Sequence, residues 1–504
     1  MGFPVKKSLK GRRAAVIGSG PAGLSAAISL AVRGARVVVI ERGPVLCPQL
    51  RAVRWGAYRF DPWPPLFSSP GVYAELFASA GHRLTDFVNF ERADPVCRVH
   101  FGDGNHFDYT GDLADLFRQA EAISASDAKG FRRLIRRGRA LSSAHQGHHR
   151  TGYQDRKWLA LDFKLWKAFP AIIDPRSDLY HARRGVRNKQ LRNAVLALRS
   201  LSQLSPARSK GGYFRWLADF QENDGWFAPG GGEVLARAML RLCELLGVKV
   251  QRNAAVEQIE LQGGRVKRLT GTGMKPIAVS IVVGAEDAPD TLRLLPQGHE
   301  EIAKLRDRWR KHVAVPARSV SILGAKKQWP ELAHLNVFAS EDAVEESRFI
   351  DRWRVPCPAP SIVVSNAVTN DATAAPAGHS ALVARIEEPN TSARFLWSTK
   401  HADERHERTV ELLEKRGLKD LRGNLDIREH ASPLTASRRE LETFARIDGY
   451  QTKSFRAALA MPPNRVMETP GLYLASAFTH PGPGSTNEIT AGMLAAVQAA
   501  DDAI

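Results

Sequence analysis

Residues 14–41 read AAVIGSGPAGLSAAISLAVRGARVVVIE, and this stretch decides the fold. Ala14–Ile17 and Ala35–Ile40 are short apolar runs, the pattern of strands buried on both faces of a parallel sheet. Between them the spacing predicts a helix that stops at Gly34. Its apolar face consists of Leu24, Ala27, Ile28 and Ala31. A strand, a glycine-rich turn, a helix and a second strand ending in Glu41 together predict a dinucleotide-binding βαβ unit.

The residues of the glycine-rich turn are the first candidates for cofactor binding. Gly18 permits the tight turn, Gly20 lets the backbone approach a pyrophosphate, and Gly23 lets the helix pack closely on the strand. Pro21 and Ala22 begin the helix, whose N-terminus offers free N–H groups and a positive dipole end to phosphates.

The end of the second strand supplies two more candidates, Glu41 and Arg42. The carboxylate of Glu41 can accept hydrogen bonds from ribose hydroxyls, and it would repel a 2′-phosphate. The position of the unit at the start of a long chain favours tightly held FAD over exchangeable NAD, but only modestly.

Further elements follow from periodicity and turn residues. A helix is expected over Leu235–Leu246, closed by Gly247, and another from the Gly/Pro-rich turn after Ala477 to about residue 501. Strands are expected over Val248–Val250, Ala255–Ile259, Arg265–Lys267, Ile277–Val283 and Gly471–Ala477.

Composition excludes several classes of protein. The chain has 504 residues, 43% of them apolar and 25% charged, so it is globular and large enough for more than one domain. Its four cysteines contain no Cys-x-x-Cys pair, which argues against a disulfide scaffold and a cysteine zinc site. We find no apolar run long enough for a transmembrane helix and expect no signal peptide, which favours the cytoplasm.

The net charge of +19 is concentrated in one segment. Residues 131–215 hold 20 Lys and Arg against four Asp. Such a segment favours a phosphate-bearing partner, which could be nucleic acid, anionic lipid headgroups or a phosphorylated substrate, and a solvated helical surface is the plainer alternative. We find no nucleic-acid-binding motif and expect no nucleic-acid partner.

Five anchors together resemble the phytoene desaturase family of FAD-dependent carotenoid desaturases and isomerases. The resemblance spans nearly the whole chain, and the C-terminal anchor is its most specific part. The anchors are the unit at 14–41, Phe60-Asp61 followed by Pro64, Phe227–Gly232, Ala254–Val256 with Ile259, and Thr479–Gly484.

The resemblance implies an α/β fold: a Rossmann-type FAD-binding domain assembled from discontinuous segments, with an inserted α+β substrate domain. The expected FAD-binding segments are 1–95, 225–290 and 465–504, and the substrate and membrane-associating segments are 96–224 and 291–464. The cofactor-binding set then grows by four residues: Val256 at the adenine end, and Ser476, Thr479 and Gly482 at the isoalloxazine.

By the same resemblance, the expected function is desaturation of a carotenoid or related polyisoprenoid by hydride transfer to flavin, with quinone or oxygen as electron acceptor. His480 and Glu488 are the candidate catalytic residues, although a structural role for His480 in its turn is equally open. We expect no metal site, because the histidines at 145, 148 and 149 have no nearby Cys or carboxylate partner.

Two departures from the family pattern keep other functions open. Cys47-Pro48 replaces a Gly-Gly pair, and the polar Ser485–Glu488 follows the C-terminal turn where apolar residues are usual. A flavin-dependent isomerase or saturase is one alternative, and a catalytically silent flavoprotein-like partner is another. For a desaturase, the basic segment predicts peripheral association with anionic lipid, in which the isoprenoid substrate dissolves.

Overall fold

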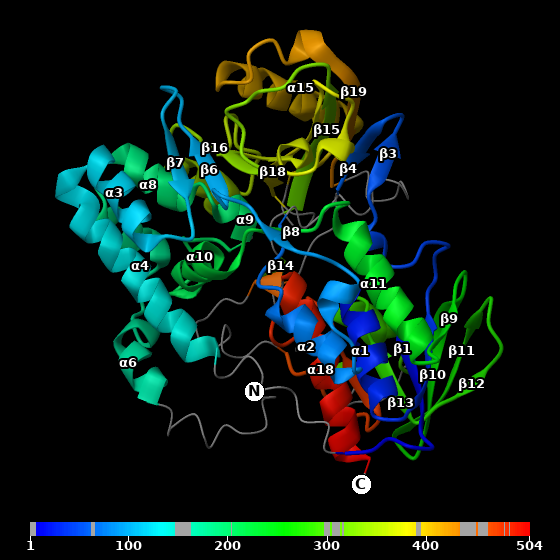
Figure 1. Cartoon of the computed structure of the whole chain (residues 1–504). Helices are drawn as coiled ribbons and strands as arrows, with labels where there is room; N and C mark the ends of the chain where they lie inside the picture. The colour runs from blue at the N-terminus through cyan, green and yellow to red at the C-terminus, as the bar shows by residue number, and fades with distance from the viewer. Residues whose placement is uncertain are drawn as a thin grey trace.

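The fold is given by a computed structural model of the chain. It describes residues 7–61, 66–146, 163–202, 204–296, 303–304, 313–314, 317–389, 395–433, 450–451, 462–477, 479–482 and 484–503. Its main parts are a five-stranded parallel sheet, a seven-stranded mixed sheet and a group of helices (Figure 1).

The unit predicted from residues 14–41 forms the centre of the parallel sheet. It consists of β1 (Arg13–Ile17), α1 (Pro21–Val32) and β2 (Arg36–Ile40). The strand order is β21-β13-β1-β2-β9, in which β9 is Lys249–Gln251, β13 is Ile281–Gly284 and β21 is Leu472–Leu474. Every pairing in this sheet is parallel, so the carboxyl ends of all five strands meet at one edge, the edge at which such sheets bind ligands.

Each face of the parallel sheet is covered by a different layer. Ala14 and Val16 pack among the helices, whereas Ala15 and Ile17 pack on a small antiparallel sheet. The helices are α1, α2 (Gly71–Ser79), α11 (Gly232–Leu245) and α18 (Ser485–Asp502), and the small sheet is β10 (Ala255–Gln262), β11 (Arg265–Thr272) and β12 (Ile277–Ala278), with α12 (Ala288–Arg293). Burial on both faces explains why the central strands β1 and β13 read as apolar runs, whereas the edge strand β9 is mostly exposed.

One expected strand was wrong in its extent. The apolar run Ile277–Val283 forms two strands in different sheets, β12 and β13, rather than one. At the break, the N–H of Val279 donates to the oxygen of Lys267, and the N–H of Ser280 donates to that of Arg13. The chain changes partner sheet between these residues, which an apolar run alone does not reveal.

The seven-stranded sheet lies at the top of Figure 1, away from the C-terminus. Its order is β19-β15-β18-β17-β16-β6-β7, with β6–β16 as its parallel pair. The strands are β6 (Cys97–His100), β7 (His106–Tyr109), β15 (Ala317–Ala325), β16 (Leu335–Phe338), β17 (Ile362–Asn366), β18 (Ser380–Glu388) and β19 (Leu425–Ala431). α15 (Thr399–Lys415) covers one face, and the hairpin of β3 (Val53–Trp55) and β4 (Tyr58–Phe60) packs on the other.

The helical group, on the left of Figure 1, contains most of the basic segment. Its helices are α3 (Leu113–Ile123), α4 (Ala125–Gln146), α6 (Phe163–Ile172), α7 (Asp178–Gly185), α8 (Lys189–Leu196), α9 (Arg199–Ser202) and α10 (Gly212–Asn223). The apolar faces of all of these helices except α6 share one core with β6 and β7, whereas α6 packs on the end of α4 in a small separate cluster. Within the described ranges, every helix is too short or too polar to cross a membrane.

The predicted fold class is confirmed. A parallel sheet with helices on one face is built from segments near residues 13–40, 249–284 and 472–502, far apart in the sequence. The helix expected from Leu235 begins three residues earlier, at Gly232, and Gly247 follows its end with a positive φ of 70°.

Candidate cofactor and substrate site

The glycine-rich turn follows β1 directly and leads into α1. A Cβ atom on Gly23 would lie 2.1 Å from the carbonyl oxygen of Gly18, so only glycine allows the helix this close to the turn. Gly20 is the N-cap, no side chain caps the helix, and Pro21 and Ala22 form its first turn. The first N–H groups of α1 have no intrahelical acceptors, so they are available to an anion.

Glu41 lies next to this turn and its carboxylate is held in place. Its Oε2 accepts hydrogen bonds from the N–H (3.0 Å) and the hydroxyl (2.6 Å) of Ser19, and its Oε1 accepts one from the N–H of Gly43 (3.0 Å). The Glu41 side chain therefore stands beside the helix N-terminus, where a ribose next to a bound pyrophosphate would lie.

The loop after β2 closes over the turn. A Cβ on Gly20 would lie 3.0 Å from Nε2 of Gln49, whose Oε1 is buried and has no hydrogen-bond partner among the described residues. Cys47 is fully buried, has a left-handed φ of 49°, and donates its N–H to the hydroxyl of Ser19 at 3.0 Å. The position where the family has glycine therefore keeps a backbone conformation that favours glycine.

Two other predicted cofactor-binding residues lie near the end of β2. The N–H groups of Ala254 and Asn253 donate to the carbonyl oxygens of Glu41 and Gly43, at 3.0 and 3.2 Å, which brings the start of β10 and Val256 to this strand end. Arg42 is exposed, and its Nε lies 3.9 Å from Oε1 of Glu286.

The C-terminal turn lies at the same edge of the sheet. The N–H of Ala475 donates to the carbonyl oxygen of Gly284, which places the turn just beyond β13. The hydroxyl of Thr479 donates to the oxygen of Ser476 (2.9 Å) and accepts from its N–H (3.0 Å). The three predicted residues Ser476, Thr479 and Gly482 are all buried. The hydroxyl of Thr479 serves to close the turn.

The two predicted catalytic residues lie in or after this turn. His480 is 6% exposed; its N–H donates to the oxygen of Pro462, and its own oxygen accepts from Asn464 Nδ2 at 2.8 Å. Glu488 lies in the first turn of α18. Neither residue lines the pocket described next.

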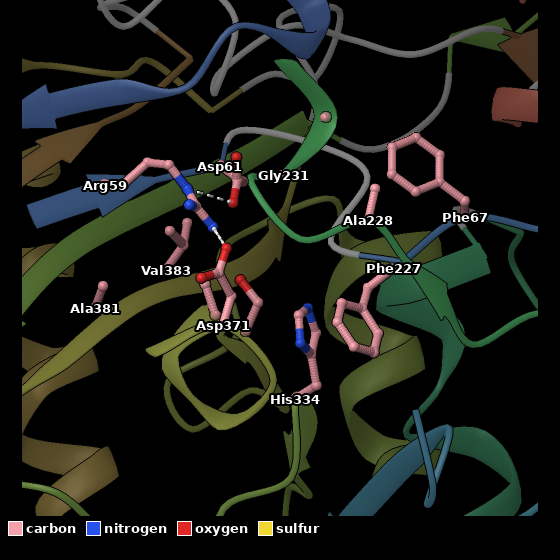
Figure 2. A pocket seen from close by; sticks show the side chains of 13 residues that line it. Arg59, Asp61, Phe67, Phe227, Ala228, Gly231, His334, Asp371, Ala381 and Val383 are labelled. Carbon is pink, nitrogen blue, oxygen red and sulfur yellow. Dashed lines mark ion pairs between the residues drawn. The ribbon is translucent and has the colours of Figure 1, made fainter. Parts of the chain in front are cut away.

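That pocket lies between the parallel-sheet region and the seven-stranded sheet (Figure 2). The space between its side chains amounts to about 480 Å³ when the part that is open solvent is counted. One wall comes from β4, β8 (Trp226–Phe227) and the start of α11, and the other from β17, β18 and the turn carrying Asp371. Its apolar lining consists of Phe67, Phe227, Ala228, Ala367, Ala381 and Val383.

Three charged side chains lie together in this pocket. Arg59 Nη2 lies 2.9 Å from Asp371 Oδ2, and Arg59 Nε lies 3.4 Å from Asp61 Oδ2 (Figure 2). Asp371 also accepts hydrogen bonds from the N–H of Gly230 (2.7 Å) and from the N–H and hydroxyl of Thr373 (3.0 and 2.6 Å).

These contacts give the two carboxyl groups different proton affinities. Burial alone would raise the pKa of Asp371, but its hydrogen bonds from Thr373, Gly230 and Arg59 lower it to about 2. Burial raises the pKa of Asp61; the charge of Arg59 opposes this rise, and the charge of Asp371 adds to it. Asp371 is therefore ionised, and of the two pocket carboxyls Asp61 is the one with the higher proton affinity.

His334 is the remaining titratable side chain in the pocket. Its ring stacks on Phe227 with 5.6 Å between centroids, and its Nδ1 lies 3.1 Å from Oδ1 of Asn370. Within the described residues, no cluster of His, Cys, Asp and Glu is suited to hold a metal ion. The loop at 147–150, with His148 and His149, lies outside those residues.

Sequence reasoning missed the pocket residues Arg59, His334 and Asp371. Asp61 was noticed only as part of an anchor. Asp371, which shares the Arg59 guanidinium with it, is 310 positions away in the sequence, so no local pattern connects the two. One signal for the pocket was present in the sequence: Arg59 and Asp61 flank Phe60, which packs in a core. In a strand this alternation places both charged side chains on the opposite face from Phe60.

The comparisons with known proteins agree with this geometry. Residues 13–333 match the family described as FAD dependent oxidoreductase. An all-trans-zeta-carotene desaturase from Myxococcus xanthus is 27% identical over 94% of this chain and 90% of its own length. A 4,4'-diapolycopene oxygenase from Methylomonas is 26% identical over 96% of this chain and 97% of its own length.

The fold has counterparts among solved structures. An oxidoreductase from Methanosarcina mazei superposes with a TM-score of 0.65 at 14% identity, covering 96% of this chain and all of the other. The residues of the glycine-rich turn fit FAD for reasons visible in the chain: a Cβ at Gly20 or Gly23 would fill the turn, and the helix N-terminus beside it is uncapped by any side chain.

Proposed function

The chain belongs to the FAD-dependent oxidoreductase family, as a divergent relative of the carotenoid desaturases, and on that premise we propose that it desaturates a carotenoid or related polyisoprenoid. FAD is its cofactor, and carotenoid desaturation is the activity that its relatives support at the level of the family.

The observation that carries the proposal is the place of the pocket. A chain of contacts links the cofactor turn to it: Gln49 packs on Gly20, Leu50 next to it packs on Gly232, and Gly231 packs on Asp61. An elongated cofactor whose pyrophosphate lies at Gly20 can reach this region with its ring. The aromatic and aliphatic lining suits a hydrocarbon chain.

The residues of this chain would bind the cofactor and exclude water. The turn at Gly18–Gly23 and Glu41 would hold the pyrophosphate and the adenosine ribose, with Val256 at the adenine end, and Ser476, Thr479 and Gly482 would lie along the isoalloxazine. When bound, FAD supplies the acceptor for a hydride. Phe227 and the strands β17 and β18 would hold the substrate and keep solvent from the reacting carbons.

We also propose that the helical group docks on an anionic membrane, from which the enzyme extracts its substrate. Phe169 and Ile173, at the end of α6, are 49% and 60% exposed. On α7, Arg183 and Arg184 are exposed as well. A basic residue near an anionic bilayer contributes about 1 kcal/mol. Other aromatic residues of this segment, such as Trp158, lie outside the described residues.

Part of the basic segment is already neutralised inside the protein. Arg137 pairs with Asp174, Arg139 lies 3.5 Å from Glu222, and Arg199 is completely buried. The positive charge available for docking is therefore smaller than the number of Lys and Arg residues in the segment suggests.

The test is to add the FAD-loaded protein, without oxygen, to carotenoid precursors of increasing desaturation in liposomes. Each new conjugated double bond shifts the polyene absorption to longer wavelength, while the flavin absorption bleaches in equal amount. Quinone or oxygen, the proposed electron acceptors, should then restore the flavin colour.

The same experiment separates the alternatives. An isomerase would change the polyene spectrum with no electron acceptor and no net flavin bleaching, and a saturase would need reduced flavin. A catalytically silent partner would give neither change, and a protein purified without flavin would support it.

A further inference from the structure

We propose that Asp61 is the residue that accepts the substrate's proton during desaturation. This inference rests on the proposed function. It assigns a catalytic role to a residue of the pocket in place of His480 and Glu488, which do not line the pocket.

The two oxygens of Asp61 have unlike surroundings. Its Oδ2 faces Arg59 Nε at 3.4 Å, whereas its Oδ1 is buried and has no hydrogen-bond partner within the described residues. A Cβ atom on Gly231 would lie 2.1 Å from this Oδ1, so the carboxyl packs directly on a backbone that only glycine provides. Figure 2 shows Asp61 between Arg59 and the Gly231 backbone.

The charges around Asp61 come from each element packed against it. Arg59 of β4 faces its Oδ2, Arg54 of β3 acts on it from a greater distance, and Asp371 lies across Arg59. Arg54 is itself paired with Glu233 of α11 at 2.8 Å. Since Asp371 and Asp61 share Arg59, one guanidinium serves two carboxylates, and among the described residues only Asp371 has further donors.

This division of donors separates the roles of the two carboxyl groups. Asp371 remains ionised and fixes Arg59, which makes both of them positioning residues. Asp61 can alternate between carboxylate and carboxylic acid, as two carboxyls in unlike environments do in general acid–base pairs. His334 is less suitable, because its ring stacks on Phe227 and its Nδ1 is engaged by Asn370.

The chemical step balances with this assignment. One of two adjacent substrate carbons loses a hydride, with its bonding electron pair, to FAD. The other carbon loses a proton to Asp61 Oδ1, and its C–H electron pair becomes the new C=C bond. The substrate is oxidised by two electrons, FAD is reduced by two, and the Asp61 carboxylic acid afterwards releases its proton to solvent.

The decisive variant is Asp61→Asn, which keeps the size of the side chain and removes the base. We expect it to retain FAD and to slow single-turnover flavin reduction by substrate at least about 100-fold, the lower range for a general base. The wild-type rate should rise with pH as Asp61 ionises, and this limb should be absent in the variant. The matched control is Asp224→Asn, because burial also raises the pKa of Asp224, to about 7, and Asp224 does not line the pocket.

A second readout does not depend on activity or on FAD. The infrared difference spectrum, FAD-free wild type minus Asp61→Asn, should contain the band of a protonated carboxyl at mildly acidic pH, and this difference band should disappear as the pH rises; other buried carboxyls such as Asp224 cancel in the difference. If the wild type desaturates and Asp61→Asn reacts at the same rate, the inference is wrong, whereas the proposed function is supported. If Asp61→Asn fails to fold, a pH-independent wild-type rate would overturn it instead. An inactive wild type with the expected infrared band would contradict the proposed function alone.

Discussion

Replacing Arg199 by methionine tests how the wall of the substrate pocket is held. Arg199 is completely buried, and its Nε lies 2.5 Å from Oε2 of Glu387, while its Nη1 lies 2.9 Å from Asp351 Oδ2 and 2.8 Å from the Ser347 hydroxyl. It thus joins α9 to β18 and to the turn η4 (Arg348–Trp353). β18 also carries Ala381 and Val383, which line the pocket.

The expected cost follows from what the substitution leaves behind. Methionine fills much of the volume of arginine, so the cavity is small. Two carboxylates, Glu387 and Asp351, then face each other with side chains only 4% and 9% exposed. Removing one partner of a buried ion pair costs about 3–5 kcal/mol. For a region of this size, such a loss lowers the melting temperature by roughly 10 °C.

The assay is thermal unfolding followed by intrinsic fluorescence at several pH values. Burial raises the pKa of Glu387, and the charge of Arg199 opposes this rise. Without the guanidinium the pKa rises further, so the folded variant takes up a proton at a pH where the unfolded chain does not. The loss of stability should therefore be largest above neutral pH and shrink as the pH falls toward about 5.

Two further variants make the reasoning refutable. The triple variant Arg199→Met, Glu387→Gln, Asp351→Asn should recover most of the lost stability, because no charge remains buried. Arg118→Met, which removes a surface pair with Asp115 whose arginine is 75% exposed, should cost less than about 1 kcal/mol. A loss that does not vary with pH and is not recovered by neutralising the carboxylates would show that the network contributes packing rather than charge compensation.

Three other predictions concern the cofactor and the membrane. Gly20→Val should abolish FAD retention, because its branched side chain would enter the space of the pyrophosphate, already bounded by the Gln49 amide 3.0 Å from a Cβ; normal flavin content would place the site elsewhere. Cys47→Gly with Pro48→Gly should increase flavin retention, because glycine adopts the left-handed conformation of position 47 without strain and lets the backbone approach the cofactor; unchanged retention would mean that the loop is already compensated. Binding to liposomes should require anionic lipid, weaken with salt and fall in Phe169→Ser with Ile173→Ser; equal binding to neutral vesicles would remove the electrostatic argument.

The sequence predicted the parts of the fold that local patterns encode. The unit at 14–41 could be predicted because strands buried on both faces and the glycines of one turn leave a contiguous signal. The C-terminal turn carried a similar signal. The division of the run Ile277–Val283 between two sheets could not be predicted, because it depends on which distant strand each half meets.

The sequence pointed to the glycine-rich turn and the C-terminal turn as candidate cofactor sites, but it did not point to the pocket. His480 and Glu488 were chosen because they adjoin a flavin motif in the sequence, but the pocket is lined by Asp61, His334 and Asp371 instead. Those residues meet through pairings across some 300 positions, which neither spacing nor composition encodes. Arg199 shows the same limit. In the sequence it counts among the positive charges of the basic segment, but it pairs with Asp351 and Glu387 in the core.

One short loop connects cofactor and pocket, and this connection explains why its sequence matters for both. Residues 47–50 place Gln49 on Gly20 and Leu50 on Gly232, one residue from the glycine on which Asp61 packs. A shift of this loop therefore moves the phosphate site and the proposed proton acceptor together. Proline at position 48 fixes φ, whereas two glycines would leave the loop free to adopt many paths. The strain at Cys47 is thus coupled to a narrower choice of loop conformations, and in the proposed reaction that choice would set the distance between the cofactor and the proposed proton acceptor. Because the two hydrogens leave neighbouring carbons, that distance must match the spacing of two bonded carbons.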